Sequence, residues 1–281
     1  MTGFLAGKAV VVTGAGRGLG AAYARLAASE GARVVVNDVD VALASEVAED
    51  LDSAVADGAD ISTWDGAGAL IDRCVAEFGA IDGLVNNAGV FRLADPTAQD
   101  PDEFRAIVEV NLLGTAYCGL HAIRAMLPRG KGSIVNVTSG AHAGSAGMGA
   151  YGASKGGVAS LTYCWAVDLA GTGVRVNAVS PNAHTRMADE YERYLGDRAL
   201  GQNIGKTPER NAPAVVYLLS DAASAVHGQV VRIDGDELSL ICHPAVLSTG
   251  ASAPEWTVER VAAAFAGELA GSLQPLGLHR I

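Results

Sequence analysis

The chain has 281 residues, of which 49% are apolar and 18% charged, and its formal net charge is −11. This composition excludes a disordered chain. The length suits one large α/β domain that buries its own core. The acidic balance argues against a nucleic acid or a membrane surface as partner, since both attract basic patches.

The four cysteines are scattered and form no Cys-x-x-Cys pair. We expect buried thiols in a reducing, cytoplasmic compartment, with neither a disulfide framework nor a metal site. The N-terminus lacks a basic segment followed by a long apolar one, so residues 9–12 predict a strand and not a signal peptide. No apolar run reaches the roughly 18 residues that a membrane-spanning helix needs.

Short β-branched runs alternate with longer helical stretches along the chain. The predicted strands are residues 9–13, 33–37, 54–56, 83–86, 133–138, 175–179 and 230–233. The predicted helices are residues 19–29, 41–50, 66–78, 102–126, 151–170 and 213–219. The strands are almost continuously apolar, as is typical of parallel strands covered on both faces. The alternation predicts an α/β fold of the Rossmann type, a doubly wound seven-stranded parallel sheet flanked by helices in a single domain.

Two segments break this rhythm. Residues 185–210 are polar and follow a predicted strand end, so we interpret them as a substrate lid over the ligand crevice. The lid belongs to a domain of residues 1–236 that holds both the cofactor site and the catalytic site.

Residues 237–281 form a C-terminal extension, which we expect to pack on the same domain. The polar stretch 248–254 is typical of a linker. Ser252 and Glu255 have the spacing of a capping box and predict a final helix that ends near Leu269.

A glycine-rich stretch, TGAGRGLG at residues 13–20, lies between the first predicted strand and the first predicted helix. Glycines there let the backbone approach a pyrophosphate, and the amino end of the helix presents its positive dipole end to the phosphates. A tight strand-to-helix turn would look similar, but the position at the first β-α junction favours a dinucleotide site. We therefore assign Gly14, Arg17, Gly18 and Leu19 to the cofactor.

Tyr151 and Lys155 lie four positions apart in a predicted helix and so share one face. A phenol has a pKa near 10, too high for a base at neutral pH. A neighbouring ammonium favours the phenolate and lowers that pKa. The Tyr-x-x-x-Lys pattern also occurs by chance on solvated helices, so its catalytic interpretation depends on the other motifs.

These motifs together resemble the short-chain dehydrogenase/reductase family. The resemblance rests on the G-x-x-x-G-x-G spacing, on Asn-Asn-Ala-Gly at residues 86–89 and on the Tyr151–Lys155 pair, and it spans about residues 8–234. It implies an oxidoreductase that moves a hydride between NAD and a secondary alcohol or carbonyl compound. It also implies a homo-oligomer, a dimer or homotetramer, that pairs through the two long helices.

Asp38 ends the second predicted strand, 18 residues after Gly20. A carboxylate there accepts hydrogen bonds from the ribose hydroxyls and repels a 2′-phosphate, which favours NAD over NADP. Arg17 favours NADP, but the free-energy cost of burying a phosphate against a carboxylate exceeds the stabilisation that one arginine supplies. Asp38 can also be an ordinary turn residue, as Asp40 can.

The resemblance assigns further residues to the adenosine half of the cofactor. Asp60 would lie near the adenine amine and Ile61 against the adenine ring. Asn87, Ala88 and Gly89 would lie against the adenosine ribose.

The resemblance places Pro181, His184 and Thr185 at the nicotinamide carboxamide and the pyrophosphate, with Lys155 on the nicotinamide ribose. The family usually has Pro-Gly where this chain has Pro181-Asn182. Asparagine tolerates left-handed geometry better than most residues, so the turn can survive. The string PNAHTRM at residues 181–187 is similar to (3R)-hydroxyacyl-CoA dehydrogenases and suggests a hydroxyacyl-type substrate.

Ser139 lies 12 residues before Tyr151 and can hydrogen-bond the substrate oxygen. The spacing of 13, which many family members use, selects Thr138. Strand alternation lets only one of the two point into the crevice, and we choose Ser139. Asn111 sits in mid-helix, where asparagine is poorly favoured. It is either a satisfied core side chain or, as the resemblance implies, a link that carries protons from Lys155 to solvent.

Two rival functions stand beside an NAD-dependent dehydrogenase. One is a catalytically silent NAD-binding regulator on the same fold, and the other is an NADPH-dependent ketoacyl-type reductase. The fold cannot decide among them. The set of Asn111, Ser139, Tyr151 and Lys155 favours an enzyme, and Asp38 favours NAD.

Overall fold

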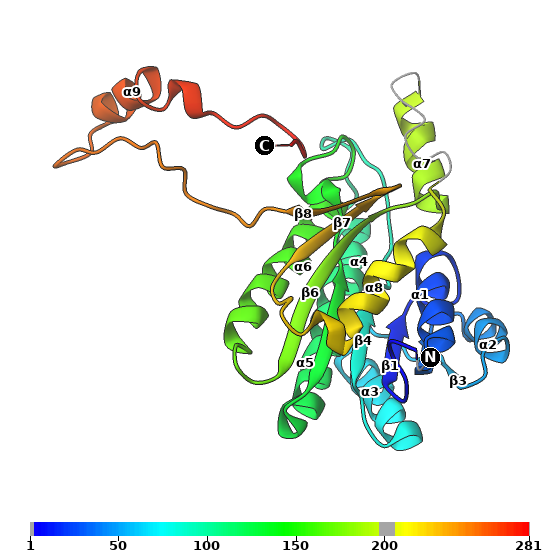
Figure 1. The fold of residues 1–281 in the computed structure, drawn as a ribbon. Coiled ribbons are helices and arrows are strands. Elements are labelled where there is room, and N and C mark those ends of the chain that lie inside the picture. Colours follow the sequence, from blue (N-terminus) through cyan, green and yellow to red (C-terminus); the bar gives the residue numbers. More distant parts are fainter. Residues whose placement is uncertain (1–2, 197–205, 281) are drawn as a thin grey trace. The chain divides into compact units, whose positions relative to one another are not determined.

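The structure, a computed structural model, describes residues 3–196 and 206–280. The chain divides into two compact units, Met1–Ile241 and Cys242–Ile281. The first unit is one sheet with helices on both faces (Figure 1). It extends five residues beyond the predicted boundary at residue 236. Part of the predicted lid, residues 197–205, lies outside the described residues.

The sheet of the first unit has the strand order β3-β2-β1-β4-β5-β6-β7-β8. The seven predicted parallel strands are confirmed. An eighth strand, which the sequence analysis missed, pairs antiparallel with β7. All but the last of its residues are exposed, so it lacks the apolar pattern of the others. The strands are β1 (Ala9–Thr13), β2 (Arg33–Asn37), β3 (Ala54–Asp57), β4 (Gly83–Asn86), β5 (Gly132–Val137), β6 (Val174–Asn182), β7 (Val230–Asp234) and β8 (Glu237–Ile241).

The helices of the first unit agree with the predicted ones except at their ends and at two places. The predicted helix 102–126 is interrupted by a π-helical segment, η1 (Glu109–Gly114), and the predicted lid contains a helix, α7. The helices are α1 (Gly18–Ser29), α2 (Val41–Glu49), α3 (Trp64–Phe78), α4 (Pro101–Val108), α5 (Thr115–Met126), α6 (Gly149–Asp168), α7 (Arg186–Leu195) and α8 (Ala212–Leu219).

The side chains of each strand alternate between two cores, one on each face of the sheet. Val10 and Val12 of β1 enter the core beneath α1, α2 and α8. Ala9 and Val11 enter the core beneath α3, α5 and α6. Apolar residues therefore occupy successive strand positions, which explains the continuous apolar runs in the sequence.

The helical stretch Pro101–Arg129 is long and apolar enough, by length and composition, to cross a membrane. The core helix of a globular protein passes the same test. Here Cys118, Ala122 and Met126 are buried in the core shared with α3 and α6. This packing explains the apolar composition.

The four cysteines are free, but only Cys74 and Cys118 are buried. Burial raises the pKa of each of these two thiols to about 12. Cys164 and Cys242 are exposed, contrary to the expectation of buried thiols. Cys164 faces outward on α6, and Cys242 begins the second unit, so neither is covered by a core.

The second unit contains one α-helix among its described residues, α9 (Val258–Ala266). The predicted start of this helix was wrong. Thr257, and not Ser252, is the N-cap, because its hydroxyl accepts a hydrogen bond from the Arg260 backbone N–H at 3.3 Å. Both residues suit a cap by type, and spacing alone could not choose between them.

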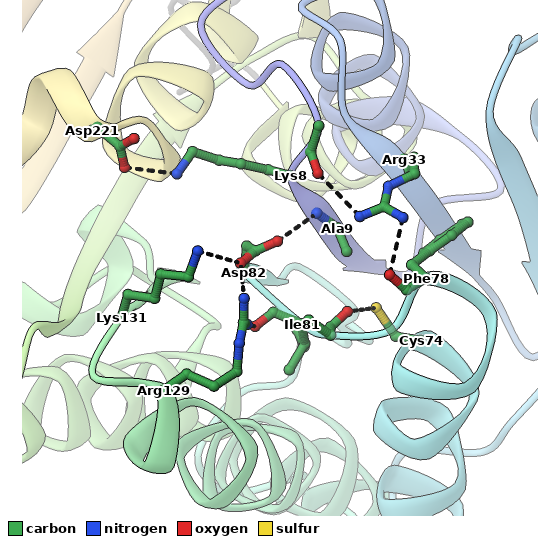
Figure 2. Close-up of polar contacts among 12 residues, drawn as sticks. Lys8, Ala9, Arg33, Cys74, Phe78, Ile81, Asp82, Arg129, Lys131 and Asp221 are labelled. Carbon is green, nitrogen blue, oxygen red and sulfur yellow. Dashed lines mark hydrogen bonds and ion pairs between the residues drawn. The ribbon is translucent and has the colours of Figure 1, made fainter.

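Charged side chains gather at the amino ends of the strands, at the edge of the sheet opposite the glycine-rich loop (Figure 2). Asp82 accepts hydrogen bonds from the Ala9 backbone N–H at 3.0 Å and from Arg129 at 2.8 Å. Arg129 also donates to the Ile81 carbonyl oxygen at 2.8 Å. Burial raises the pKa of Asp82, but the Ala9 and Arg129 hydrogen bonds and the charges of Arg129 and Lys131 outweigh it and hold that pKa below its ordinary value. Asp82 therefore joins the starts of β1, β4 and β5.

Replacing Asp82 with Asn should lower the free energy of unfolding at pH 7 by about 1–3 kcal/mol, because a charged acceptor is lost from two hydrogen bonds. A carboxyl group with a lowered folded-state pKa stabilises the protein above its unfolded pKa of about 3.9, and this stabilisation disappears as the pH falls through the folded pKa. The difference between wild type and Asp82→Asn in urea unfolding should therefore shrink below about pH 4. Asp221→Asn is the control, because Asp221 is 92% exposed in its ion pair with Lys8. Equal effects of the two changes would contradict the role given to Asp82.

Candidate functional site

The glycine-rich loop joins β1 to α1 at the carboxyl edge of the sheet. Gly14 (φ 60°) and Gly18 (φ 58°) have left-handed backbone conformations. A Cβ atom on Gly14 would lie 2.7 Å from the Ala88 Cα atom, and one on Gly20 would lie 2.3 Å from the Gly14 carbonyl oxygen. The loop thus packs directly on the segment after β4 and leaves its outer backbone open to a ligand.

The amino end of α1 has no side-chain cap and no acidic residue in its first turn. By contrast, α2, α3 and α4 begin with capping side chains from Asp40, Thr63 and Asp100. Uncapped N–H groups and the helix dipole together favour an anion. The pyrophosphate of a dinucleotide therefore fits this position.

Asp38 lies beside the glycine-rich loop, just after β2. Its Oδ2 accepts a hydrogen bond from the Gly16 backbone N–H at 3.1 Å, and its Oδ1 accepts one from the Asp40 backbone N–H at 3.1 Å. The Asp38 carboxylate therefore hydrogen-bonds within its own turn, as an ordinary turn aspartate does, and it also contacts the glycine-rich loop. Arg17 is exposed. The negative charge is therefore fixed next to the loop, while the arginine extends into solvent.

The residues expected at the adenine have different environments. Asp60 is exposed, and its Oδ1 accepts hydrogen bonds from the Ser62 backbone N–H at 2.9 Å and the Ser62 hydroxyl at 2.7 Å. The Ile61 side chain is 4% exposed, and a Cβ atom on Gly114 would lie 2.7 Å from its Cδ1. Ile61 thus packs against the π-helical segment. Val39, next to Asp38 and 68% exposed, offers an apolar surface that the sequence analysis missed.

The segment after β4 is tied to the end of β1. The Thr13 hydroxyl accepts hydrogen bonds from the backbone N–H groups of Asn87 and Ala88, each at 3.0 Å. The Asn87 side-chain amide donates to the carbonyl oxygens of Thr13 at 2.9 Å and Gly14 at 3.0 Å. Thr13 was missed, and its only signal was a polar residue at the end of an apolar strand. The contacts fix Asn87 and Ala88 against the glycine-rich loop, and Gly89 follows.

Tyr151 and Lys155 come together on the first turns of α6. The Lys155 Nζ atom lies 5.8 Å from the centroid of the Tyr151 ring and donates to the Val137 carbonyl oxygen at 2.7 Å. Phe91, which the sequence analysis did not single out, packs edge-to-face on Tyr151 with ring centroids 5.1 Å apart. The partly buried phenol and the buried amine therefore lie together at the carboxyl ends of β4 and β5.

Burial shifts both pKa values toward the neutral forms. It raises the pKa of Tyr151 to about 12, against a lowering by the hydrogen bond with Ser139. It lowers the pKa of Lys155 to about 8. The lowering of the phenol pKa that was expected from the Lys155 ammonium is therefore not found: burial dominates, and the Ser139 hydrogen bond is what opposes it. A phenol with this pKa is neutral at pH 7, and acting as a base would require a positive charge beside it.

The structure separates Ser139 from Thr138. The Thr138 side chain is 1% exposed, and its hydroxyl donates to the Lys155 carbonyl oxygen at 2.8 Å. The Ser139 hydroxyl instead bonds to the Tyr151 side chain and accepts from the Ala141 backbone N–H at 3.2 Å. Thr138 therefore holds the catalytic helix to β5, while Ser139 stands beside the phenol.

Asn111 lies in the π-helical segment, and its side chain is fully bonded. Its Oδ1 accepts from the Val90 backbone N–H at 2.7 Å, and its Nδ2 donates to the Val90 carbonyl oxygen at 3.0 Å and the Ser154 hydroxyl at 3.2 Å. A Cβ atom on Gly89 would lie 3.3 Å from Asn111 Oδ1 and 3.7 Å from Lys155 Nζ. Asn111 is thus a satisfied core side chain close to Lys155, and the proton relay stays a prediction.

The end of β6 differs from the expected turn. Asn182 continues the strand opposite Asp234, and its amide donates to the Asp234 carboxylate at 3.0 Å. None of the non-glycine residues that the structure describes has a positive φ, so Asn182 does not use left-handed geometry. The reason is the partner on β7, which holds Asn182 extended. Pro181, also in β6, is partly buried.

His184 and Thr185 lead directly into α7. The His184 backbone N–H donates to the Lys206 carbonyl oxygen at 2.6 Å, and the His184 ring pairs with Asp189 at 2.9 Å. The Thr185 hydroxyl caps the helix by accepting from the Ala188 backbone N–H at 3.3 Å. His184 and Thr185, the predicted nicotinamide contacts, are thus held at the start of α7.

The helix α7 also contacts the loop before Tyr151. A Cβ atom on Gly147 (φ 71°) would lie 2.7 Å from ring atoms of Tyr194. The Gly147 carbonyl oxygen accepts from the Ala94 backbone N–H at 3.0 Å. No sequence pattern indicated this contact. The helix α7 therefore lies against the loop that precedes Tyr151.

A cleft of about 660 Å³ opens beside the glycine-rich loop, between α1, α2 and Pro208. Arg17, Arg25 and Glu46 are among its lining residues, but Tyr151 is not. The cleft thus adjoins the glycine-rich loop and does not reach Tyr151. Among the described residues, no group of three or more His, Cys, Asp or Glu side chains is placed to hold a metal ion.

Known proteins resemble this chain over most of its length. Residues 14–235 match the family model described as enoyl-(acyl carrier protein) reductase. The chain is 42% identical over 242 residues to cis-4-hydroxycyclohexanecarboxylate dehydrogenase of Sinomonas cyclohexanicum, covering 81% of this chain and 95% of that protein. It is 36% identical over 249 residues to 3-oxoacyl-[acyl-carrier-protein] reductase FabG of Thermotoga maritima, covering 82% and 98%.

The fold has a solved counterpart in a short-chain dehydrogenase from Mycobacterium avium. That crystal structure has 34% sequence identity and a TM-score of 0.86, and the match covers 98% of each chain. Both the sequence and the fold are therefore shared over nearly the whole catalytic unit. The chain belongs to the short-chain dehydrogenase/reductase family, whose members transfer a hydride between a nicotinamide cofactor and a hydroxyl or carbonyl group.

Proposed function

We propose that this oxidoreductase is NAD-dependent and interconverts a secondary alcohol and a carbonyl compound, with Tyr151 as the acid/base group. The observation that supports this best is the convergence of the partly buried Ser139 and Tyr151 with the buried Lys155, whose Nζ lies near Gly89. The nearby segments Gly14–Leu19, Asn87–Gly89 and Pro181–Thr185 suit the two ends of a dinucleotide. A silent regulator on this fold would need none of the three catalytic groups.

The bound nicotinamide supplies the hydride donor or acceptor. In reduction, the neutral Tyr151 hydroxyl gives its proton to the substrate oxygen, and in oxidation the Tyr151 phenolate removes the proton of the substrate hydroxyl. The Ser139 hydroxyl hydrogen-bonds the same oxygen and stabilises the charge that develops there. The Lys155 ammonium favours the phenolate when Tyr151 must act as a base. We assign Asn111 to the path by which Lys155 exchanges protons with solvent.

The preference for NAD rests on Asp38. Its carboxylate is fixed at 3.1 Å from the Gly16 backbone nitrogen, where it can accept hydrogen bonds from the ribose hydroxyls and where a 2′-phosphate would meet a like charge. Arg17 is exposed and can move toward a phosphate, which supports the alternative of an NADPH-dependent ketoacyl-type reductase.

Two substrate classes are candidates. The hydroxyacyl type is suggested by the PNAHTRM string, and a cyclic hydroxy acid is suggested by the name of the Sinomonas relative. We further propose a cytoplasmic homo-oligomer, a dimer or tetramer. Exposed apolar residues on or just after the two long helices, Val167 of α6 and Leu127 directly after α5, support such pairing.

Replacing Tyr151 with Phe should lower kcat by about 10²–10⁴-fold, because the proton donor is lost while the ring that packs on Phe91 stays. The dissociation constant for NAD, measured by calorimetry, should stay within about twofold, since adenosine and pyrophosphate contacts are unchanged. Turnover is measured with hydroxyacyl thioesters and with hydroxycyclohexane carboxylates. A variant with near wild-type turnover would refute the assignment of Tyr151.

Ser139→Ala and Thr138→Val form a matched pair that removes one hydroxyl each. Ser139→Ala should lower kcat by about 10²–10³-fold, because a hydrogen bond to the developing charge is lost. Thr138→Val should keep kcat within about tenfold and lower the unfolding free energy by about 1 kcal/mol, because its hydroxyl only ties β5 to α6. The reverse pattern in steady-state kinetics and urea unfolding would show that Thr138 is the catalytic hydroxyl.

Asp38→Asn should shift the ratio of NADP to NAD affinity toward NADP by about tenfold or more, because the like charge facing a 2′-phosphate is removed. Arg17→Gln tests the competing residue and should leave the wild-type preference for NAD in place. The two dissociation constants are measured for each variant by fluorescence titration. Tighter binding of NADP than NAD by the wild type would replace the NAD assignment with the NADPH-dependent alternative.

A further inference from the structure

A charged cluster at the carboxyl ends of β6 and β7 has no part in the chemistry described above. Its centre is Asp234, the last residue of β7. Asp234 Oδ1 accepts hydrogen bonds from Lys206 Nζ at 2.6 Å and from the Asn182 amide at 3.0 Å, and Oδ2 accepts one from Arg232 at 2.8 Å. One carboxylate thus accepts hydrogen bonds from β6, from β7 and from Lys206 in the last part of the predicted lid.

The cluster is largely shielded from water. The side chains of Lys206, Arg232 and Asp234 are 20%, 23% and 28% exposed. Burial raises the pKa of Asp234, but the hydrogen bonds and charges of Lys206 and Arg232 outweigh it and hold that pKa below its ordinary value. Asp234 is therefore ionised at neutral pH and binds both cations at once.

Lys206 connects this carboxylate to the residues expected at the nicotinamide. Its backbone carbonyl oxygen accepts the His184 N–H at 2.6 Å, while its ammonium is bound to Asp234. Thr185, the next residue, caps α7. The backbone at His184 and the backbone at Lys206 therefore lie side by side, and Asp234 holds Lys206 in place through its ammonium.

Asn182 provides a second connection. Its amide donates to Asp234, and its backbone forms the last pair of the β6–β7 ladder with the same residue. A glycine at this position could make the backbone pair but not the side-chain hydrogen bond. The departure from the family's Pro-Gly pattern thus adds a side-chain anchor just before His184.

We infer that Asp234 is a positioning residue, which holds the His184–Thr185 backbone at the nicotinamide end of the cofactor site through Lys206 and Asn182. It touches neither cofactor nor substrate. This inference rests on the proposed function, because it assigns the nicotinamide to that backbone. A small displacement of groups that orient reactants lowers rates strongly, so loosening this anchor should affect catalysis more than folding.

The test compares Asp234→Asn with Asp236→Asn. Asp236 lies on the same turn and pairs with Arg210, but its side chain is 85% exposed. For Asp234→Asn we expect kcat/KM to fall by between about tenfold and a hundredfold, with KM for the alcohol raised. NAD should bind more weakly, while ADP-ribose, which lacks the nicotinamide, should bind as to wild type. Asp236→Asn should match wild type in all these measurements.

Conservative and disruptive variants of the partners separate positioning from folding. Lys206→Arg should keep most of the wild-type kcat/KM, because it preserves the ion pair, whereas Lys206→Met should behave like Asp234→Asn. Asn182→Gly should give a smaller effect of the same kind. A fall in kcat that follows the loss of folded protein in thermal unfolding, with KM and the ratio of NAD to ADP-ribose affinity unchanged, would overturn the inference.

The two proposals fail in different ways. If the wild type turns over no substrate with either cofactor, the proposed function fails, and the NAD and ADP-ribose affinities of Asp234→Asn still test the inference. If the wild type is active and Asp234→Asn equals Asp236→Asn in kinetics and binding, the inference fails and the function stands.

Discussion

The proposed acid/base site depends on a buried amine, Lys155, and a partly buried phenol, Tyr151, that lie together on α6. Lys155 is 3% exposed, and the one hydrogen bond from its Nζ that the structure shows goes to the Val137 carbonyl oxygen. Burial disfavours the charged forms of both Lys155 and Tyr151, so both side chains tend toward neutrality. Any positive charge brought close to the pocket then acts in a medium of low polarity, where it shifts a phenol pKa far more than it would in water.

This arrangement requires strand ends that do not move. At the end of β1, Thr13 holds the segment Asn87–Gly89 against the glycine-rich loop. At the end of β5, Thr138 bonds to the backbone of Lys155 and fixes the catalytic helix. At the end of β7, Asp234 collects its three donors. Polar residues at or just after the ends of apolar strands thus hold these segments at the carboxyl edge of the sheet. An open parallel sheet has its binding site at that edge.

The sequence was sufficient for the features that come from repeated local patterns. All seven parallel strands and all the helices except α7 followed from apolar periodicity and glycine positions, although most helix ends differ by one or two residues. The glycine-rich loop and the Tyr151–Lys155 pair followed from fixed spacing. The strand β8 could not be predicted, because its exposed residues carry no alternation. The thiol of Cys164 was misjudged because residue type does not report which face of a helix meets a core. The thiol of Cys242 was misjudged because it lies beyond the first unit, in a segment without regular structure.

Other misses arose because they depend on contacts between distant segments. The conformation of Asn182 is set by Asp234, and the seating of Tyr194 is set by the absence of a side chain at Gly147. The sequence spacing allowed both Ser139 and Thr138. The structure places the Ser139 hydroxyl at the phenol and the Thr138 hydroxyl on the Lys155 carbonyl oxygen, and the choice of Ser139 as the catalytic hydroxyl stays a prediction. The pKa of Tyr151 was expected to fall, but the cost of burial depends on packing that local sequence does not reveal.

The same cost of burial bears on the choice between an enzyme and a silent regulator. An amine with its pKa lowered from 10.5 to about 8 has been moved into surroundings that oppose its charge, which weakens folding at neutral pH. A binding module gains nothing from this, since an apolar side chain of the same size would pack between α6 and β5 without that penalty. A free-energy cost of this kind is typical of sites where a group exchanges protons. Here the costly group, Lys155, lies beside the Tyr151 phenol, which is hydrogen-bonded to Ser139. The arrangement is explained by acid/base chemistry, and binding alone does not explain it.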